Sequence, residues 1–530
     1  MDSSLGTRIS LAGNTGTVRF VGNVQGTSGV WLGIEWDDPT RGKHDGVHNE
    51  TRYFNCSVPN SGSFIRPTAQ NLSYGVSFLQ ALSAKYVEQL HGAATQEKVI
   101  LGSSNGSIEV EGPHLDKIRK KLARLDRLRD VSLDGERVAR ADPGDTIRRT
   151  CSNIRNLDLS HSLLPSWDVV AAIVAELPGL QSLALNHNRL QQPSDLAKMA
   201  ASFQHLEELQ LNATLTSWSA MLDVIRYTPK LRFLEMGYNY LTHLENNLVT
   251  SDAMGECVLQ SLNLDSNECK DWPAVCQAMQ IFPSLQRLLL SSNGIAQIPY
   301  PAEGQSEILQ GLHHLALPSN LLCSWSDIDA LSRWCPGLKT LALGLNPFVV
   351  GEAHARYSKQ ITVALMPYLV ILDGVNISAK ERVDCELFYL SYVAKNGFQS
   401  HLSPADYPRW QELCAKHGEP SVVTNNHESS AKLSTRLIGI RVYQYSEPPA
   451  RTLTVPTRKP DAVIQVLPTM TLRMLRNKIG KSLKASRKTA SLWILLDEGT
   501  TTVELSKDED GHSLDWLGIE NDSQLVVVLG

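Results

Sequence analysis

The sequence predicts a multidomain protein that joins a small all-β barrel, an α/β solenoid and a final α+β domain. Three observations predict this organisation. Residues 1–70 are rich in glycine, and their short apolar runs are bounded by glycines. A leucine pattern then recurs eight times, with starts 25 to 28 residues apart. Beyond residue 435, apolar runs with strand-like spacing surround one stretch with helical spacing.

The first 150 residues are expected to contain one folded domain and a connecting region. Runs at 18–21 and 31–36 are apolar and flanked by glycine, which predicts short strands joined by tight turns over residues 1–70. Residues 71–150 are less regular, and we interpret them as a linker and N-terminal cap. A strand or short helix is expected at 79–90. A basic helix is expected over 114–130, because its leucines and isoleucines have helical spacing.

Residues 151–375 repeat themselves. The pattern L-x-x-L-x-L-x-x-N resembles the leucine-rich-repeat signature. Its copies begin at Ile154, Leu180, Leu206, Leu231, Leu259, Leu285, Leu312 and Leu338. Each copy should supply a short strand whose leucines point inward, and an Asn that bonds backbone groups in the turn. Interleaved residues, such as Gln181 and Ser182, should face outward on a concave side and offer a long binding surface.

The remaining residues are expected to close the array and add a separate fold. Residues 357–373 resemble the terminal cap of a leucine-rich-repeat array, and 376–434 are expected to be a helical segment followed by a linker. Within 435–530, strands are expected at 437–442, 463–467, 492–496 and 525–529, with a helix over 472–483. This order resembles the ubiquitin-like β-grasp fold.

Composition narrows the class of function. The formal net charge of −5 argues against nucleic acid as a partner. Nine scattered cysteines without zinc spacing indicate reduced thiols, and no signal peptide or membrane span is apparent. These features predict a cytoplasmic protein without a membrane partner. No P-loop, GxSxG or HExxH motif occurs, so we expect neither an enzyme nor a cofactor or metal site.

The most specific motif lies in residues 13–66. A Gly-Thr-Val-Arg-Phe-Val-Gly run at 16–22 precedes Gly-Val-Trp-Leu-Gly-Ile-Glu at 29–35 and Gly-Lys-His-Asp-Gly at 42–46. Arg-Tyr-Phe at 52–54 and Ser-Phe-Ile-Arg-Pro at 63–67 follow. Together these runs resemble the CAP-Gly (cytoskeleton-associated protein, glycine-rich) family. Only the central Asn of that family's Gly-Lys-Asn-Asp-Gly hallmark differs, being His44 here.

The resemblance implies binding of acidic C-terminal tails that end in Glu-Glu-Tyr or Glu-Glu-Phe, notably that of α-tubulin. Residues 1–70 hold six Lys/Arg and six Asp/Glu, so attraction must come from local placement. Lys43 and exposed backbone N–H groups would hold a carboxylate, between apolar walls from Trp31 and Phe64. The candidate tail-binding residues are Trp31, Gly42, Lys43, His44, Asp45, Gly46, Arg52, Phe64 and Arg66.

Simpler interpretations stand beside these. Any one of the glycines could be only a turn former, His44 only a satisfied loop residue, and Trp36 only core. Gly26 stands where the family usually has an aromatic residue, so one wall of the site would be missing. The basic helix that begins near Arg473 could be a solvated face or could dock on an acidic partner.

The combination of modules over nearly the whole chain resembles a tubulin-folding cofactor. The resemblance implies α-tubulin as the client and tubulin-folding cofactors B, C and D as partners in forming or dissociating the αβ heterodimer. It implies a cytoplasmic, cytoskeleton-associated location. Two alternatives are a microtubule-associated adaptor with a CAP-Gly domain and a ubiquitin-pathway scaffold whose last domain docks on proteasomal or ubiquitin receptors.

Overall fold

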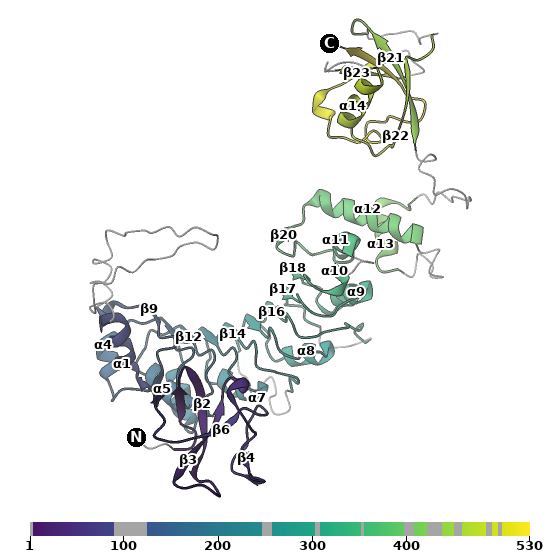
Figure 1. Cartoon of the computed structure of the whole chain (residues 1–530). Coiled ribbons are helices and arrows are strands. Elements are labelled where there is room, and N and C mark those ends of the chain that lie inside the picture. The colour runs from purple at the N-terminus through teal and green to yellow at the C-terminus, as the bar shows by residue number, and fades with distance from the viewer. Residues whose placement is uncertain are drawn as a thin grey trace. The chain divides into compact units, whose positions relative to one another are not determined.

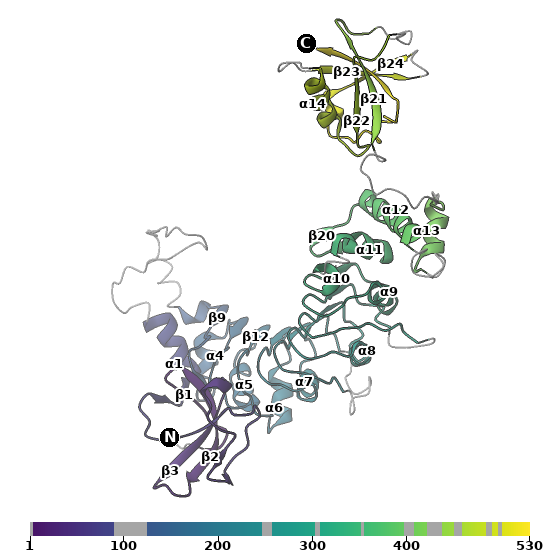
Figure 2. The same cartoon turned by 45° about the vertical axis from the view of Figure 1, so that its right-hand side comes forward.

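The computed structural model contains two compact units, Met1–Ser421 and Val422–Gly530. It describes residues 4–88, 124–245, 257–302, 308–350, 355–396, 407–420, 437–449, 458–483, 490–496 and 501–529. The first unit holds an N-terminal antiparallel sheet and a long array of strands and helices (Figures 1 and 2). The second unit is a separate sheet with one helix packed on it. Each is described below by itself.

The N-terminal sheet has five antiparallel strands in the order β6-β3-β2-β1-β7. They are β1 (Arg8–Leu11), β2 (Asn14–Asn23), β3 (Val30–Trp36), β6 (Gly62–Ile65) and β7 (Leu72–Ser73). A hairpin of β4 (Val47–His48) and β5 (Thr51–Arg52) accompanies them. Leu32, Ile34 and Trp36 of β3 lie in the core of the N-terminal sheet, which confirms Trp36 as a core residue. Because side chains alternate along a strand, Trp31 and Gly33 face the opposite side of β3.

Only two residues separate the N-terminal sheet from β8, the next strand of the unit. β7 ends at Ser73, and β8 (Val76–Ser77) begins after Tyr74 and Gly75. β8 pairs in parallel with β10 (Val138–Arg140), and Arg140 Nη1 donates to the Gly75 carbonyl at 3.2 Å. Gly75 has φ +74°, and an added Cβ would lie 2.4 Å from the Arg137 carbonyl oxygen. The chain therefore passes directly from one sheet into the other part of the unit.

The region interpreted as linker and cap contributes to the core of the array. The expected element at 79–90 is a helix, α1 (Phe78–Ser83), extended by a π-helical turn at Ala84–Glu88. The helix expected over 114–130 lies mostly outside the described residues. Its described end is not α-helical, because η3 (Leu125–Arg127) is a single 3-10 turn and β9 (Asp130–Ser132) is a strand. β9 pairs in parallel with the next repeat strand, so the array begins one repeat before residue 154.

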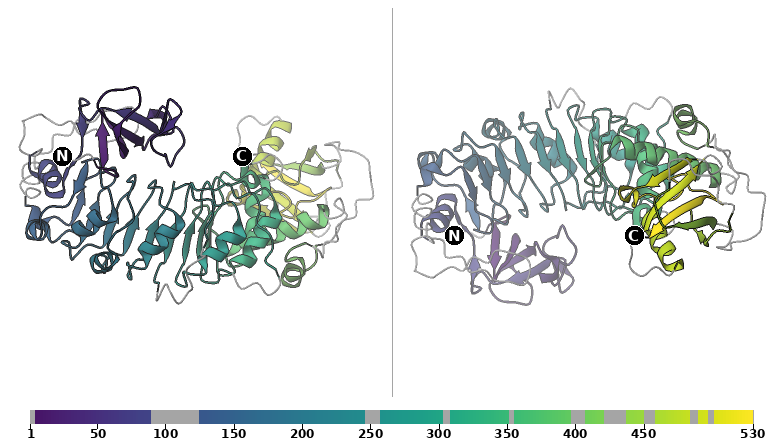
Figure 3. Two further views of the ribbon diagram at one scale, coloured as in Figure 1. Left: turned by 90° about the horizontal axis from the view of Figure 1, so that it is seen from below. Right: turned by 90° about the horizontal axis from the view of Figure 1, so that it is seen from above.

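The array is one sheet of eleven strands, running from β9 to the terminal β20 in sequence order. Between them come β11 (Asn156–Asp158), β12 (Ser182–Ala184), β13 (Glu208–Gln210), β14 (Phe233–Glu235), β15 (Ser261–Asn263), β16 (Arg287–Leu289), β17 (His314–Ala316), β18 (Thr340–Ala342) and β19 (Ile371–Leu372). All pairings are parallel except that of β19 with β20 (Val375–Asn376). The strands line one side of the array and the helices the other (Figures 1 and 3).

Helices return the chain between most successive strands of the described residues. They are α4 (Thr146–Cys151), α5 (Trp167–Val174), α6 (Leu196–Ser202), α7 (Trp218–Ile225), α8 (Trp272–Met279), α9 (Trp325–Trp334), α10 (Pro347–Val350) and α11 (Ser358–Leu365). Ser217 and Asp271 cap α7 and α8, each accepting a bond from a backbone N–H of the first turn. The Trp that follows each of these caps is buried against the strands.

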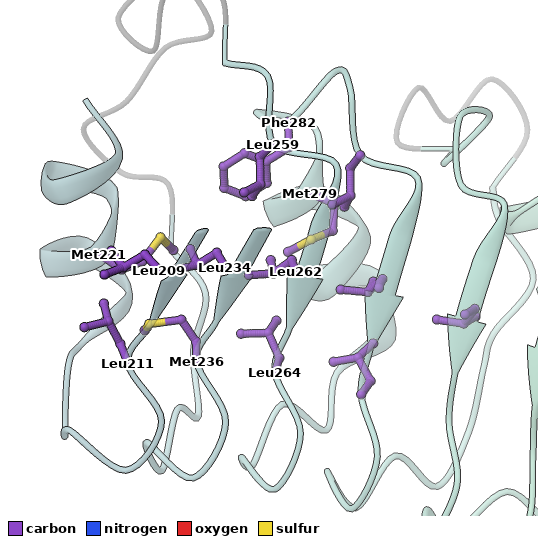
Figure 4. Packing of buried hydrophobic residues seen from close by; sticks show 14 of the residues in the cluster. Leu209, Leu211, Met221, Leu234, Met236, Leu259, Leu262, Leu264, Met279 and Phe282 are labelled. Carbon is purple, nitrogen blue, oxygen red and sulfur yellow. The ribbon is translucent and has the colours of Figure 1, made fainter. Parts of the chain in front are cut away.

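The leucines of each repeat fill a continuous core between strands and helices. Leu209, Leu234 and Leu262 sit at equivalent positions of adjacent strands and point to the same side (Figure 4). Each is at most 1% exposed. Burying one such side chain contributes about 1.5–3 kcal/mol. Since a single repeat would leave this face in water, the repeats stabilise one another.

The repeat asparagines bond backbone groups as predicted. Asn267 Nδ2 donates to the carbonyls of Met236 and Leu264, at 3.0 and 2.9 Å. Its Oδ1 accepts from the N–H groups of Asn239 and Leu241, at 2.9 and 3.1 Å. Three of these four partners belong to the preceding repeat. The asparagines therefore form a buried ladder that joins each turn to the one before it.

The far end of the array is closed by a turn and two helices. Asp373, between β19 and β20, accepts through Oδ1 from the Leu343 N–H at 2.7 Å. α12 (Ala379–Asn396) packs on α11, and α13 (Trp410–His417) packs on α12. Burial raises the pKa of Glu386, but hydrogen bonds from Lys416 and His417, both at 2.7 Å, outweigh it and leave that pKa below its ordinary value. This ionised carboxylate links α12 to α13.

The second unit is a mixed five-stranded sheet in the order β22-β21-β25-β23-β24. Its elements are β21 (Ile438–Tyr445), β22 (Ala462–Val466), α14 (Leu472–Ser482), β23 (Ala490–Leu496), β24 (Thr501–Leu505) and β25 (Gln524–Leu529). β21 and β25 are parallel neighbours at the centre. Leu472, Leu475 and Ile479 of α14 are buried in its core. The helix and four strands match the predicted positions, and β24 is an additional edge strand.

Candidate functional site

The loop at 42–46 is held against the N-terminal sheet by its glycines. A Cβ on Gly42 would lie 2.0 Å from the Asn60 carbonyl oxygen. Gly46 has φ +79°, and a Cβ there would lie 2.0 Å from the Phe54 carbonyl oxygen. Both positions therefore require glycine for packing within the domain itself.

Most backbone N–H groups of this loop are occupied. The N–H groups of Lys43 and His44 both donate to the Gly62 carbonyl, at 2.7 and 3.2 Å, and the Gly62 N–H donates back to His44 at 2.8 Å. The N–H of Gly42 donates to Pro39, and that of Gly46 to the His44 ring. Side chains, rather than these amides, are thus the donors that the loop presents outward.

Lys43 presents the loop's positive charge. Its side chain is exposed, and within the described part of the chain it forms no ion pair. Arg52, by contrast, is committed: its Nη1 donates to the Asp45 carbonyl at 2.7 Å and to the Asp45 carboxylate at 3.2 Å. Arg52 and Asp45 therefore brace the loop, while the Lys43 ammonium stays available to an anion.

His44 lies between the loop and an aromatic cluster. Its Nδ1 accepts a bond from the Gly46 N–H at 3.0 Å, so that nitrogen carries a lone pair rather than a proton. Burial and the neighbouring His48 and Lys43 lower the pKa of His44, while Asp45 opposes them. The imidazole is accordingly neutral near pH 7 and keeps its proton on Nε2. It replaces the amide donor of the family's Asn with a ring N–H.

Phe64 is the centre of the aromatic cluster. Its ring centroid lies 5.0 Å from His44, 5.5 Å from both Tyr53 and Phe54, and 6.1 Å from Phe20. Gly33 pairs with Phe64 across β3 and β6, and its missing side chain leaves room for these rings. The result is a half-buried aromatic surface beside the Lys43 loop.

Trp31 and Arg66 form a second contact on the same sheet. The Arg66 guanidinium lies 3.8 Å from the centre of the Trp31 ring, and Trp31 Nε1 donates to Thr27 Oγ1 at 2.8 Å. This pair does not join the ring cluster directly. It is connected to Phe64 through β6, because Arg66 follows Phe64 by two residues and faces the same side.

The structure thus brings together Lys43, His44, Asp45, Gly46, Arg52 and Phe64, with Gly42 at the loop's start and the Trp31–Arg66 pair beyond them. Sequence reasoning missed Phe20 and Tyr53 as members of the surface, and Phe54 as a buried ring that packs against Phe64. Their signal was present, since Tyr53 and Phe54 belong to the Arg-Tyr-Phe run. Tyr53 Oη also accepts from the Gln25 N–H at 2.8 Å, which places a ring beside the turn where Gly26 lacks one.

An ammonium that forms no ion pair with the described residues, next to half-buried aromatic rings, fits a peptide that carries both carboxylates and an aromatic side chain. Among the residues that the structure describes, no three His, Cys, Asp or Glu side chains gather as a metal site. No helix in the described part of the chain is long and apolar enough to cross a membrane.

Solved structures and known proteins resemble parts of this chain. The APL1 leucine-rich repeat domain is 19% identical, with a TM-score of 0.28, and covers 48% of this chain and 63% of its own. A ubiquitin-like domain of an Arabidopsis thaliana protein is 22% identical, with a TM-score of 0.13, and covers 20% of this chain and 89% of its own. The CAP-Gly domain family matches residues 5–70.

Relatives match over most of the length. Tubulin-specific chaperone E of Danio rerio is 32% identical over 457 residues, covering 83% of this chain and 84% of the relative. That of Rattus norvegicus is 30% identical over 540 residues, covering 99% and 98%. Tubulin-folding cofactor E of Arabidopsis thaliana is 30% identical over 433 residues, covering 80% of each. The chain therefore belongs to the tubulin-specific chaperone E family.

Proposed function

We propose that the chain is a tubulin-folding chaperone that binds α-tubulin and, with tubulin-folding cofactors B, C and D, assembles or dissociates the αβ heterodimer. The names of its relatives refer to tubulin folding. The observation that carries the proposal is the exposed, unpaired Lys43 ammonium beside the Phe64 aromatic cluster. An acidic tail with an aromatic end is complementary to both.

Each residue of the site has a part in this proposal. Lys43 pairs with a carboxylate of the tail, and His44 Nε2 donates a second hydrogen bond to it. The rings around Phe64 contact the aromatic residue of the tail. Asp45, Arg52 and the two glycines hold the loop in place, and the Trp31–Arg66 pair extends the surface along the peptide.

The repeat array supplies a second contact. We assign it as a leucine-rich-repeat solenoid that binds the folded body of α-tubulin while the N-terminal domain holds the tail. Tethering one contact raises the effective concentration of the other, so two modest affinities combine into tight capture. Tail-less α-tubulin should therefore bind more weakly than the intact protein.

The second unit fits a ubiquitin-like domain by the order of its strands and its single helix. We propose that it is recognised by other cofactors, by tubulin or by ubiquitin receptors. The domain limits proposed are 1–70, 71–150, 151–375, 376–434 and 435–530. In this scheme the chain works in the cytoplasm with the cytoskeleton, and any GTP turnover belongs to tubulin.

Substitution of Lys43 tests the tail-binding part. Lys43→Ala should weaken binding of a fluorescent peptide ending in Glu-Glu-Tyr by about tenfold, because one charge-assisted contact is lost. Fluorescence anisotropy with the full chain measures this. Lys198→Ala, an exposed lysine on α6, is the matched control and should bind like the parent. Equal affinity of the Lys43→Ala and parent proteins would refute the tail site.

A further inference from the structure

The repeat sheet has an open face formed by the side chains that flank the buried leucines. On this face one row of register partners crosses five strands: Glu208 on β13, Phe233 on β14, Ser261 on β15, Arg287 on β16 and His314 on β17. We call it the open-face row. Neighbouring strands in a sheet lie about 4.8 Å apart, so these residues form a continuous line.

The β13 end of the open-face row is anionic. Gln210 Nε2 donates to Glu208 Oε1 at 2.7 Å, and Asn212 Nδ2 donates to Glu235 Oε2 at 2.7 Å. Asn186 in turn donates to Gln210 Oε1 at 3.0 Å. These amides are neutral, so they fix the two carboxylates without cancelling their charge. Within the described residues, neither glutamate forms an ion pair.

The other end of the row is cationic. Arg287 is exposed, and it forms no ion pair with any described residue. Burial and then the Arg287 charge lower the pKa of the adjacent His314. Glu208 and Arg287 are three strands apart, about 14 Å, which is beyond the reach of a direct ion pair. The two charges are therefore separated along the face and leave each other uncompensated.

Phe233 lies between these charges and is 45% exposed. Its row partners are Glu208 on one side and the small Ser261 on the other, which leaves the ring uncovered. If the face carried only charged side chains, it would be typical of a surface that contacts water alone. A large aromatic ring in water, between fixed charges of opposite sign, is instead typical of the centre of a protein interface.

We propose that the open-face row is the docking surface for the folded body of a protein with complementary polarity. That partner places a basic patch against Glu208 and Glu235, an apolar side chain on Phe233 and an acidic patch against Arg287. The proposal rests on the proposed function in one respect: the partner is the body of the same tubulin whose acidic tail binds near Lys43. The reversal of sign along the row fixes the direction in which that body lies on the array.

The contact with the folded body can be measured separately by using tubulin whose C-terminal tails have been removed by protease. Three variants of the full chain probe the row: Glu208→Lys combined with Glu235→Lys, Arg287→Glu, and Phe233→Ala. Each should weaken binding of tail-less tubulin by about tenfold, as measured by biolayer interferometry. The two charge variants should also flatten the dependence of affinity on salt concentration.

Matched controls reverse charge away from the row. Lys198→Glu on α6 and Asp384→Lys on α12 are exposed and unpaired among the described residues, and both should bind tail-less tubulin like the parent. Circular dichroism melting of every variant checks that the array stays folded. Parent-like binding by all three row variants would overturn the docking surface. So would an equal loss in the controls.

The two proposals fail separately. Lys43→Ala should leave the affinity for tail-less tubulin unchanged, while weakening that for the intact protein. If the parent binds the Glu-Glu-Tyr peptide but not tail-less tubulin, the docking surface is wrong and the tail site stands. If row variants lose tail-less tubulin while the Lys43 variant binds peptide normally, the tail site is wrong and the docking surface stands.

Discussion

Gly46 illustrates how a binding loop depends on residues that touch no ligand. Its φ of +79° belongs to the left-handed region, and its α-carbon lies against the Phe54 backbone. The same glycine donates its N–H to His44, which sets the tautomer of that ring. A side chain at this position would therefore disturb the loop and the ring together.

Gly46→Ala should destabilise the N-terminal domain by about 2 kcal/mol or more, because it adds a backbone clash to the left-handed strain. Gly13→Ala is the matched control: Gly13 has φ +85°, but nothing lies within 4 Å of its added Cβ. That variant should lose only about 1 kcal/mol. Thermal unfolding of both proteins, followed by calorimetry, measures the difference. Equal losses would mean that the close approach to Phe54 is unimportant.

The sequence predicted that local placement would supply the positive charge, with Lys43 as the candidate, and it predicted Phe64 as an apolar wall. It could not predict which of the loop's donors are already bonded. The N–H groups of Lys43 and His44 meet Gly62, a residue some twenty positions later, and that pairing depends on the register of β6. The sequence likewise could not predict that Arg52 is paired with Asp45.

At the scale of elements, the buried asparagines explain why short strands of three residues suffice. Each strand contributes few hydrogen bonds of its own, and the asparagine ladder adds bonds between turns. Among the eight copies the ladder changes at two positions, where Ser162 and Thr214 take the place of Asn. The Thr214 N–H donates to Asn239 Oδ1 at 2.9 Å. The turn is kept although one amide is replaced by a hydroxyl.

Replacing Asn267 by Ala should cost the array about 3 kcal/mol or more, because it removes partners from four buried backbone groups. Asn263→Ala is the control, since this residue lies on the open face and its side chain bonds, among the described residues, only the Asp265 N–H, at 2.8 Å. It should cost about 1 kcal/mol. Urea titration followed by circular dichroism compares them. A loss no larger at Asn267 than at Asn263 would contradict the role of the ladder.

Most repeat strands could be predicted, because leucines recur at fixed spacing. Strands β9 and β24 are examples that this pattern does not reveal. β9 has Val131 where its neighbours have leucine, and no Asn follows at the usual distance. β24 is an edge strand, so only Leu505 is buried among its five residues, and its polar sequence resembles a loop. An edge or terminal strand needs less apolar surface, which is why pattern alone misses it.

At the scale of the whole molecule, the chain divides into two units with separate cores. The hydrophobic core of the second unit, which includes Ile440, Leu475 and Val527, contains only residues of that unit among those described. The N-terminal sheet has a small core of its own, but only two residues separate it from β8. The glycine-rich composition of the N-terminal sheet distinguishes it from the leucine-rich array in the sequence. The two-residue connection between β7 and β8 is too short to be predicted from composition.

The fragment 435–530 should fold alone and melt at the same temperature as the corresponding transition in the full chain, because its core is self-contained. Calorimetry of fragment and full chain compares the two. A melting temperature lower by more than about 5 °C would correspond to about 1 kcal/mol of lost stabilisation and would show that the first unit supports the second.

The asparagine ladder also gives the array a direction. Asn267 serves the backbone of the repeat before it, and Asp373 does the same for the last repeat through Leu343. During synthesis, each segment that leaves the ribosome therefore completes the turn made just before it. Assembly can therefore follow translation one repeat behind synthesis, and a nascent chain stopped midway lacks these partners at its newest turn.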